Sequence, residues 1–370
     1  MKEIKFSKNN LSSKSNLFIS NIIKTGWLTH GKYTDLFEKE FKKLVKCKYA
    51  LTVSSCTAGL HLAFLASQIK KGDEVIVPSM SHTATSHAVE YTGAKVKFAD
   101  VDINTGNLDL DNIKKVFSKN TKAIAVVHMT GLSCDMKNIK SFCKKKKILL
   151  IEDCAHSLGS TYNKVHVGNF GLVGSFSFYP TKQITTGEGG MITTNNKKIF
   201  EKIKSLKAFG IDKDVKSRSV PGHYDVKALG LNYRMTDFQA AMGYDQITSY
   251  KKNLEVRKKI AKRYISNLSQ NANINFMPFN NECSYFVFQI FVKNRNGLIK
   301  HLKSKKIGFS IHYAKALPDM SYYKKKYNLP TSSYRQARKY AKTNVSLPVY
   351  SKLTFSEVDR ISKTINSFFK

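Results

Sequence analysis

Lys182 is the residue whose place in the sequence most clearly suggests chemistry. It follows an alternating, strand-like stretch, 175–179, and a Gly/Thr-rich turn separates it from a second apolar stretch, 190–194. A lysine at such a junction is either a surface cation on a loop or a partly desolvated amine with a lowered pKa. A desolvated amine can form a Schiff base with a carbonyl compound. The segment alone leaves both possibilities open.

A second candidate lies where the apolar stretch 148–154 ends. Asp153 falls at that end, where a buried carboxylate requires a partner, and His156 follows three residues later. Asp153 either caps the next segment or faces a protonated heteroaromatic nitrogen, the pairing that keeps the ring of pyridoxal phosphate cationic. His156 is either a hydrogen-bonded structural histidine or a contact of the same ring. These residues are therefore candidate catalytic groups.

A third candidate is a phosphate-binding helix start in "SSCTAGLHLAF", residues 54–64. Helix N-termini with free N–H groups and hydroxyl side chains bind phosphate, here through Thr57 and the amide of Ala58. The segment is neither a Walker loop nor GxGxxG. His82 adds a flat ring for stacking. A lysine, a carboxylate, a phosphate cup and a stacking face satisfy the requirements of pyridoxal phosphate chemistry, although an α/β protein of another kind remains possible.

The elements that must position these residues alternate along the first half of the chain. Short apolar runs are separated by helical patterns at 57–69, 83–93, 109–118 and 135–146; the runs are 49–55, 73–79, 94–102, 123–129 and 148–154. This alternation predicts a mostly parallel sheet covered by helices. Ligands gather at the carboxyl ends of such strands, where Ser54, Ser55, Ser79, His128 and Asp153 fall.

The composition changes in the second half. The polar stretch 210–226 is a candidate mobile loop over the site, and one helical stretch runs from a Thr236 cap to about Leu268. Strand-like segments and helices follow, at 284–292, 296–305, 309–313, 332–342 and 355–369. We therefore expect a large cofactor-binding domain, with the N-terminal segment, over residues 1–250. A smaller α+β domain is expected over 251–370.

The net charge of this 370-residue chain is +36, from 62 Lys and Arg against 26 Asp and Glu. Lysine dominates the short basic runs, whereas base reading favours arginine, and no nucleic-acid-binding motif accompanies them. A lysine-rich solvated surface explains the charge better than nucleic-acid binding does. The same field would attract an anionic small substrate.

Cysteine usage and apolar patterning indicate a cytoplasmic protein. The six cysteines are scattered without zinc-site spacing, so we expect reduced thiols and no metal site. No apolar run reaches the roughly 18 residues that a membrane span needs. The first 18 residues contain no hydrophobic secretory region. We therefore expect neither secretion nor a membrane partner.

Ordered segments over nearly the whole chain resemble the DegT/DnrJ/StrS family of sugar aminotransferases. They include "TGWLTHGKYTDLFEKEF" (25–41), "GDEVIVPSMSHTATSHAVEYTGAKVKFADVD" (72–102), "IEDCAHSLGS" (151–160), "SFSFYPTKQITTGEGGMITTN" (175–195), "LGLNYRMTDFQAAMGYDQI" (229–247) and "IHYAKALP" (311–318). The resemblance implies a fold type I pyridoxal phosphate enzyme, with a large α/β domain and a smaller C-terminal one.

The resemblance also implies roles for particular residues. Lys182 would bind the cofactor aldehyde and shuttle the proton, while Asp153 would pair with the pyridinium nitrogen and His156 would lie near the phenolic oxygen. His82 occupies the stacking position, and Thr57, the Ala58 amide and Ser177 would hold the phosphate. Asn232 would reach the phosphate of the partner subunit's cofactor, which requires a homodimer with shared sites. For Asn232 and Arg234, loop hydrogen bonding is the alternative.

The implied reaction is transfer of an amino group from L-glutamate to a nucleotide-linked keto-deoxy sugar for surface polysaccharide or glycan biosynthesis. Relatives with histidine in place of the lysine act as dehydratases, so Lys182 favours transamination. The turn "TTGEGG" (185–190) resembles members that act on 4-keto-6-deoxyhexoses, although Glu188 can also be structural. A dehydratase or epimerase on the same scaffold, and a regulatory or nucleic-acid-binding protein, are the alternatives.

Overall fold

A seven-stranded sheet forms the centre of the computed structural model, which describes residues 2–213, 218–330 and 333–370. The strands follow the order β1 (Tyr49–Val53), β9 (Gly190–Thr194), β8 (Val173–Ser177), β5 (Leu149–Asp153), β4 (Thr121–Val127), β2 (Glu74–Pro78) and β3 (Lys95–Ala99). Only β9 of this sheet runs antiparallel to its neighbours, so the other six strands point the same way. The predicted α/β class and mostly parallel sheet are confirmed.

Helices cover both faces of the sheet because alternate strand residues are apolar on each side. Val75 and Val77 of β2 pack in one cluster with α3 (Cys56–Ala66), α4 (Thr83–Glu90) and α7 (Lys197–Leu206). Ile76, between them, packs on the opposite face with α5 (Leu110–Val116) and α6 (Met136–Lys146). Burial on both faces explains the near-continuous apolar runs of these strands.

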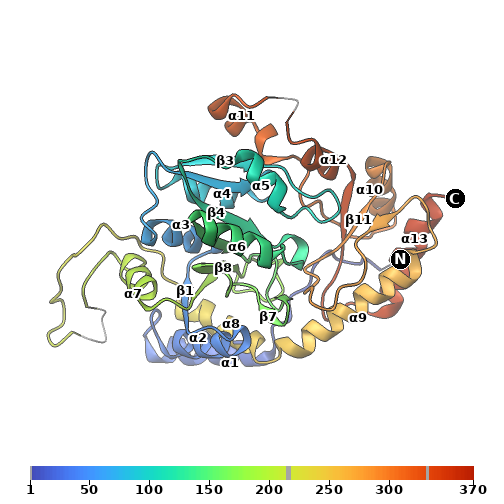
Figure 1. The fold of residues 1–370 in the computed structure, drawn as a ribbon. Helices are drawn as coiled ribbons and strands as arrows, with labels where there is room; N and C mark the ends of the chain where they lie inside the picture. Colours follow the sequence, from blue (N-terminus) through green and yellow to red (C-terminus); the bar gives the residue numbers. More distant parts are fainter. Residues whose placement is uncertain (1, 214–217, 331–332) are drawn as a thin grey trace.

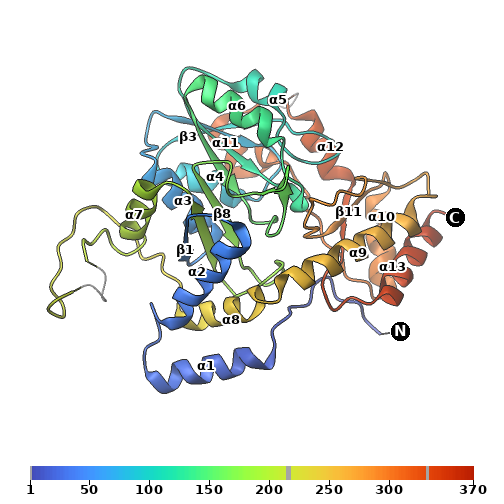
Figure 2. The ribbon, with the colours of Figure 1, turned by 60° about the horizontal axis from the view of Figure 1, so that its bottom comes forward.

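A third cluster covers the β1–β9–β8 end of the sheet. Phe37 and Phe41 of α2 (Lys32–Val45) pack with Phe176 of β8 and with Ala240 of α8 (Asp237–Ile247). Helix α1 (Ser13–Thr25) lies against α8, which Figure 2 shows from below. Thr236 caps α8 as predicted, in a capping box with Gln239.

The C-terminal third forms its own sheet and core. Antiparallel strands β10 (Asn275–Phe276), β11 (Phe288–Phe291) and β12 (Asn344–Leu347) pack with α9 (Tyr250–Leu268), α10 (Arg295–Ser304) and α13 (Phe355–Phe368). The N-terminal residue Ile4 joins this core and pairs with Ile307, so both termini lie on this side in Figure 1. The division into two domains near residue 250 stays a prediction.

Smaller elements complete the described chain. A two-stranded sheet of β6 (Thr161–Tyr162) and β7 (Val165–His166) follows β5. Helices α11 (Ser321–Tyr327) and α12 (Arg335–Thr343) lie between α10 and β12. Among the helices described, none has both the length and the apolarity that crossing a bilayer requires.

Three predicted elements differ from the structure. The helix predicted from Thr236 to Leu268 is two helices, α8 and α9, because the chain leaves the helical conformation at Ser249. The strand predicted at 284–292 shrinks to β11, because Tyr285 adopts a left-handed conformation with φ of 48°. The extended segment 309–313 pairs with β12 only at Ser310.

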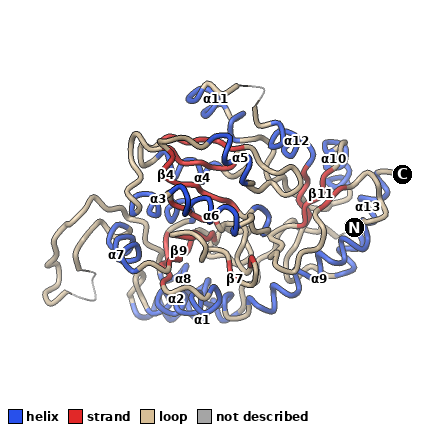
Figure 3. Tube along the Cα trace, viewed as in Figure 1, coloured by secondary structure: helices blue, strands red, loops and turns tan. Residues whose placement is uncertain are grey.

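Part of the chain between α7 and α8 extends away from the rest as an arm, defined here as residues 209–213 and 218–229 (Figures 1 and 2). Its described residues contain neither helix nor long strand (Figure 3), and Ile211 pairs with Val226 at its base. Residues 214–217 of the predicted mobile loop lie outside the described residues. The arm's described residues do not line the cavity that holds Lys182, and the expectation that this loop covers a site stays a prediction.

Candidate active site

A cavity of about 420 Å³ opens at the carboxyl ends of the parallel strands. Its walls come from residues that end or follow five strands: Ser55 after β1, His82 after β2, Val127 of β4, Asp153 of β5 and Ser177 of β8. Lys182 lines the same cavity. Of the residues expected to converge at this sheet edge, Ser55 and Asp153 line the cavity, whereas Ser54 does not. The volume lies in the range of ligand pockets.

The amine of Lys182 is partly desolvated rather than free in bulk water. The side chain is half-buried, and Nζ lies 4.5 Å from the centroid of the Phe286 ring. Burial lowers the pKa of Lys182 to about 8, and the negative charge of Asp153 opposes part of this shift. Of the two possibilities that the sequence left open, this environment favours the partly desolvated amine with a lowered pKa.

Asp153 presents a buried carboxylate to the cavity, with 4% of its surface exposed. Oδ2 accepts a 2.8 Å hydrogen bond from Thr85 Oγ1, and Oδ1 accepts a 3.0 Å bond from the Ala155 amide. The sulfur of Cys56 lies 3.7 Å from Oδ1. The contact with Ala155 closes a turn and no helix begins there, so the helix-capping alternative for Asp153 is wrong.

His156 is almost fully buried and stacks on Phe286, with ring centroids 4.4 Å apart. Its Nε2 lies 3.2 Å from the hydroxyl of Tyr313, whereas its buried Nδ1 has no hydrogen-bond partner among the described residues. Burial and the positive charge of Lys182 hold the pKa of His156 well below its usual value. The ring is therefore neutral at pH 7, with one nitrogen available to a ligand.

The start of α3 forms one wall of the cavity through Ser55, Cys56 and Thr57. The Ser55 side chain caps the helix by accepting the amide of Ala58 at 3.0 Å, so this amide, predicted to hold phosphate, already has a partner within the chain. Gly190 of β9 permits the close approach, since a Cβ there would lie 2.6 Å from the Ser55 carbonyl carbon. Thr57 remains a half-buried residue of the wall.

His82 caps α4, with Nδ1 accepting the Ala84 amide at 3.2 Å. Its ring is exposed at the mouth of the cavity and lies 5.9 Å from the Tyr313 ring. Because Nδ1 accepts, the proton of the neutral ring sits on Nε2. Partial desolvation by the surrounding residues and the charge of Lys182 lower the pKa of His82, which favours this neutral, capping form.

Asn232 does not line the cavity, and neither does Ala58, whose neighbours Cys56 and Thr57 do. Asn232 is exposed, pairs with Ala208, and accepts a 3.0 Å hydrogen bond from Arg234 Nε. The loop hydrogen bond proposed as an alternative is therefore present.

Sequence reasoning gave no individual role to several residues at the site, among them Cys56, Thr85, Phe286, His312 and Tyr313. His312 and Tyr313 line the cavity from the C-terminal third, and the adjacent "HY" pair was the available signal. Phe286 carried no such signal, because it lay inside an apolar run that read as a strand.

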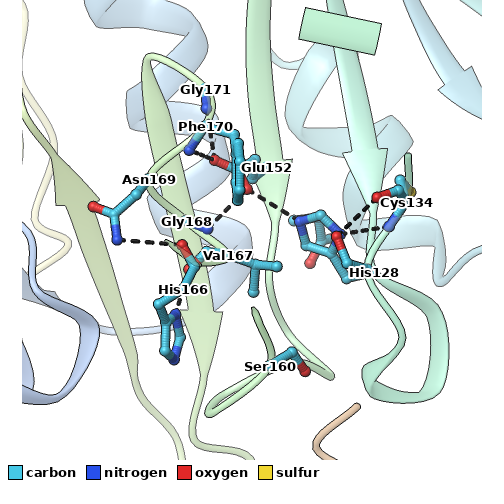
Figure 4. Close-up of polar contacts among 12 residues, drawn as sticks. His128, Cys134, Glu152, Ser160, His166, Val167, Gly168, Asn169, Phe170 and Gly171 are labelled. Carbon is cyan, nitrogen blue, oxygen red and sulfur yellow. Dashed lines mark hydrogen bonds and ion pairs between the residues drawn. The ribbon is translucent and has the colours of Figure 1, made fainter. Parts of the chain in front are cut away.

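His128 and Ser79, also predicted at the strand ends, do not line the cavity. His128 Nε2 instead donates to Glu152 Oε2 at 3.1 Å, while its Nδ1 accepts the Cys134 amide (Figure 4). Glu152 also accepts the amides of residues 168, 170 and 171. Burial alone would raise the pKa of Glu152, but these hydrogen bonds lower it. The pair therefore anchors the loop before β8.

Replacing Glu152 with glutamine is expected to destabilise the protein by about 3 kcal/mol, because the new NH₂ group would face buried N–H donors. Urea unfolding of the cofactor-free protein measures this change. Glu255→Gln, at an exposed ion pair with Lys258, serves as the control and should change stability by less than about 0.5 kcal/mol. Equal stability of the two variants would contradict the anchoring role.

Comparison with known proteins shows the family to which this chain belongs. The model of the DegT/DnrJ/EryC1/StrS aminotransferase family matches residues 10–366. The chain belongs to this family. It is 32% identical to GDP-perosamine synthase of Escherichia coli O157:H7, over 100% of this chain and 99% of the relative. It is 33% identical to the spore coat polysaccharide biosynthesis protein SpsC of Bacillus subtilis, covering 95% and 93%.

Solved structures agree with this assignment. Spr1654 of Streptococcus pneumoniae in its PLP form superposes with a TM-score of 0.92 and 27% identity, over 99% of this chain and 98% of that chain. The protein is therefore a pyridoxal phosphate-dependent aminotransferase of the sugar aminotransferase family. The fold type and cofactor predicted from the resemblance are confirmed.

The residues present fit the cofactor of this aminotransferase. The cavity holds a lysine of lowered pKa, a buried carboxylate and the hydroxyls of a helix start. The unpartnered Nδ1 of His156 is the buried polar atom that a bound ring would satisfy.

Capture of pyridoxal phosphate by the cofactor-free aminotransferase is expected to accelerate as the pH rises to about 8 and then to level off, because only the neutral form of an amine can attack an aldehyde and the pKa of Lys182 is about 8. At pH 7 about one tenth of the amines would be neutral, against about 1 in 3,000 at an unshifted pKa. Stopped-flow absorbance measures the rate. Asp153→Asn removes a charge that raises the lysine pKa and should move the midpoint to lower pH. A rate independent of pH between 6.5 and 8 would contradict the lowered pKa.

Proposed function

We propose that this aminotransferase transfers the amino group of L-glutamate to a nucleotide-linked 4-keto-6-deoxyhexose in the cytoplasm, for polysaccharide or glycan biosynthesis. One observation carries the proposal: a partly desolvated Lys182 and a buried Asp153 line one cavity beside the N-terminus of α3. The names of the relatives, GDP-perosamine synthase and a spore coat polysaccharide protein, support a sugar acceptor of this class.

In the proposed mechanism, bound pyridoxal phosphate supplies the carbonyl that carries the amino group and the ring that takes up electrons. Neutral Lys182 would act first as the nucleophile that binds the cofactor. It would then act as the base that moves a proton between a carbon of the cofactor and a carbon of the amino donor or, in the second half-reaction, of the sugar. Asp153 holds the ring nitrogen protonated through its charge. Each role follows from the chemistry of the side chain at the cavity wall.

The remaining wall residues position the ring in this proposal. Thr57 and Ser177 would bind the phosphate together with free amides at the start of α3, where the helix dipole favours an anion. The Ala58 amide would join them if the phosphate displaced Ser55. His82 would stack on the ring, and Nδ1 of His156 would pair with its phenolic oxygen.

A panel of keto sugar nucleotides incubated with ¹⁵N-glutamate tests the substrate assignment. We expect a mass increase that contains one ¹⁵N in a 4-keto-6-deoxyhexose product, and 2-oxoglutarate in equal amount. A product formed without glutamate and without nitrogen would instead assign the dehydratase or epimerase activity. Absence of labelled product from every sugar, with a different amino acid or keto acid consumed, would overturn the sugar acceptor.

We also propose that two copies share their active sites. Asn232 is exposed at the base of the arm, and the arm carries large exposed apolar side chains, including Val226 at 58% and Leu229 at 94% exposure. A patch of this kind on a projecting segment indicates a protein interface. In the dimer Asn232 would bind the phosphate of the partner subunit's cofactor.

Light scattering and mixed variants test the shared site. The wild-type mass should be that of a dimer, and Leu229→Asp should give inactive monomers. Lys182→Ala and Asn232→Ala, each weakly active, should regain activity when mixed and refolded together, because one site of a mixed dimer is intact. A fully active monomer would contradict the proposal.

A further inference from the structure

The geometry points to Thr85 as the positioning residue of Asp153. We infer that its hydroxyl fixes the orientation of the carboxylate toward the ring nitrogen of the cofactor. The inference rests on the role proposed for Asp153 and extends it to a residue of α4. Thr85 itself is not among the residues that line the cavity, so it acts through the carboxylate.

The surroundings of Thr85 direct its hydroxyl to a strong hydrogen bond with Asp153. It lies in the first turn of α4, is fully buried, and its Oγ1 is 2.8 Å from Asp153 Oδ2 and 2.8 Å from Ser81 Oγ. An ionised carboxylate only accepts hydrogen bonds, so Thr85 donates to Asp153 and Ser81 donates to Thr85. The direction of the chain Ser81–Thr85–Asp153 is thereby fixed.

The other contacts of Asp153 cannot replace this bond. The Ala155 amide belongs to the turn that Asp153 itself begins, so it does not tie the carboxylate to another element. Cys56 offers only a weak thiol donor at 3.7 Å, and its sulfur lies 3.3 Å from the Ser175 carbonyl oxygen, which competes for the same proton. Thr85 is thus the strong donor that links the carboxylate of β5 to α4.

The position of Thr85 on α4 adds geometric precision. His82, the proposed stacking residue, caps the same helix three residues earlier. One helix start therefore sets both the plane of the stacked ring and the direction of the carboxylate at its edge. Because the terminal torsion of an aspartate is broad, loss of the hydroxyl would allow the carboxylate to turn away from that edge.

The test combines Thr85→Val, which removes the hydroxyl at nearly constant shape, with Thr85→Ser, which keeps it. Each variant is loaded with pyridoxal phosphate labelled with ¹⁵N in the ring. The ¹⁵N chemical shift then reports protonation of the ring nitrogen, and a fluorescence titration gives cofactor affinity. Thr193→Val is the matched control, since the hydroxyl of this buried threonine bonds the Gly168 carbonyl outside the site.

We expect Thr85→Val to move the ¹⁵N shift toward that of a neutral pyridine and to weaken cofactor binding about 10-fold. Thr85→Ser and Thr193→Val should keep the wild-type shift. If Thr85→Val does not fold, Thr85→Ala, which creates no clash, gives the same comparison. A wild-type shift and affinity in the folded hydroxyl-free variant would overturn the inference, provided that Asp153→Asn does change the shift. An unchanged shift in Asp153→Asn would instead overturn the proposed role of Asp153.

Discussion

Lys182→Ala is expected to lose transamination by at least about 10⁴-fold, the largest effect of any single substitution, because nucleophile and base disappear together. The purified variant should not retain cofactor after borohydride reduction, whereas the wild-type protein should carry it on the peptide that contains Lys182. Mass mapping of the reduced peptides and a single-turnover assay with ¹⁵N-glutamate measure the two effects.

The control for this variant is Lys315→Ala, a nearby exposed lysine of the same C-terminal segment as Tyr313. It should retain wild-type cofactor content on Lys182, which separates loss of one amine from a change in overall charge. A small primary amine in the buffer should restore part of the activity of Lys182→Ala, since it supplies a base to the empty volume. Lys182→Ala that aminates a keto sugar at the wild-type rate would exclude Lys182 as the catalytic amine.

Asp153→Asn is expected to lower kcat about 10³-fold, the second largest effect, because the neutral amide cannot hold the ring nitrogen protonated. The substitution keeps the shape of the side chain, so the hydrogen bond with Thr85 can persist through the amide oxygen. Burial of the position, with 4% exposure, excludes bulk water as a substitute for the lost charge.

Steady-state kinetics with glutamate and the pH profile of cofactor absorbance check this expectation. Asp111→Asn, at a highly exposed carboxylate paired with Lys114, is the control and should leave kcat unchanged. Wild-type kcat in Asp153→Asn, with cofactor bound on Lys182, would contradict electrostatic stabilisation by this carboxylate.

The apolar pattern of the sequence predicted the sheet well. Each strand is buried on both faces of the sheet, so its own few residues are apolar on both sides. Val75, Ile76 and Val77 carry that information within five residues of chain. The apolar pattern of residues 284–292 does not determine how far β11 extends. Hydrogen bonds from the amides of residues 284 and 286 to the carbonyls of residues 131 and 130 bend the chain at Tyr285. Prediction therefore failed where a distant contact overrode a local pattern.

The sequence by itself determined the chemistry-bearing types at the strand ends: Lys182, Asp153 and the helix start near Thr57. It also determined the sheet class, because alternating apolar runs and helical patterns admit few other arrangements.

Only the tertiary structure decided which groups meet those residues. Thr85 reaches Asp153 across 68 residues of chain, and Tyr313 reaches His156 across 157. Such pairs depend on the order of strands in the sheet and on how the C-terminal third packs against it. Local periodicity determines neither the strand order nor this packing, because hydrogen-bond partners at that separation become neighbours only in the complete fold.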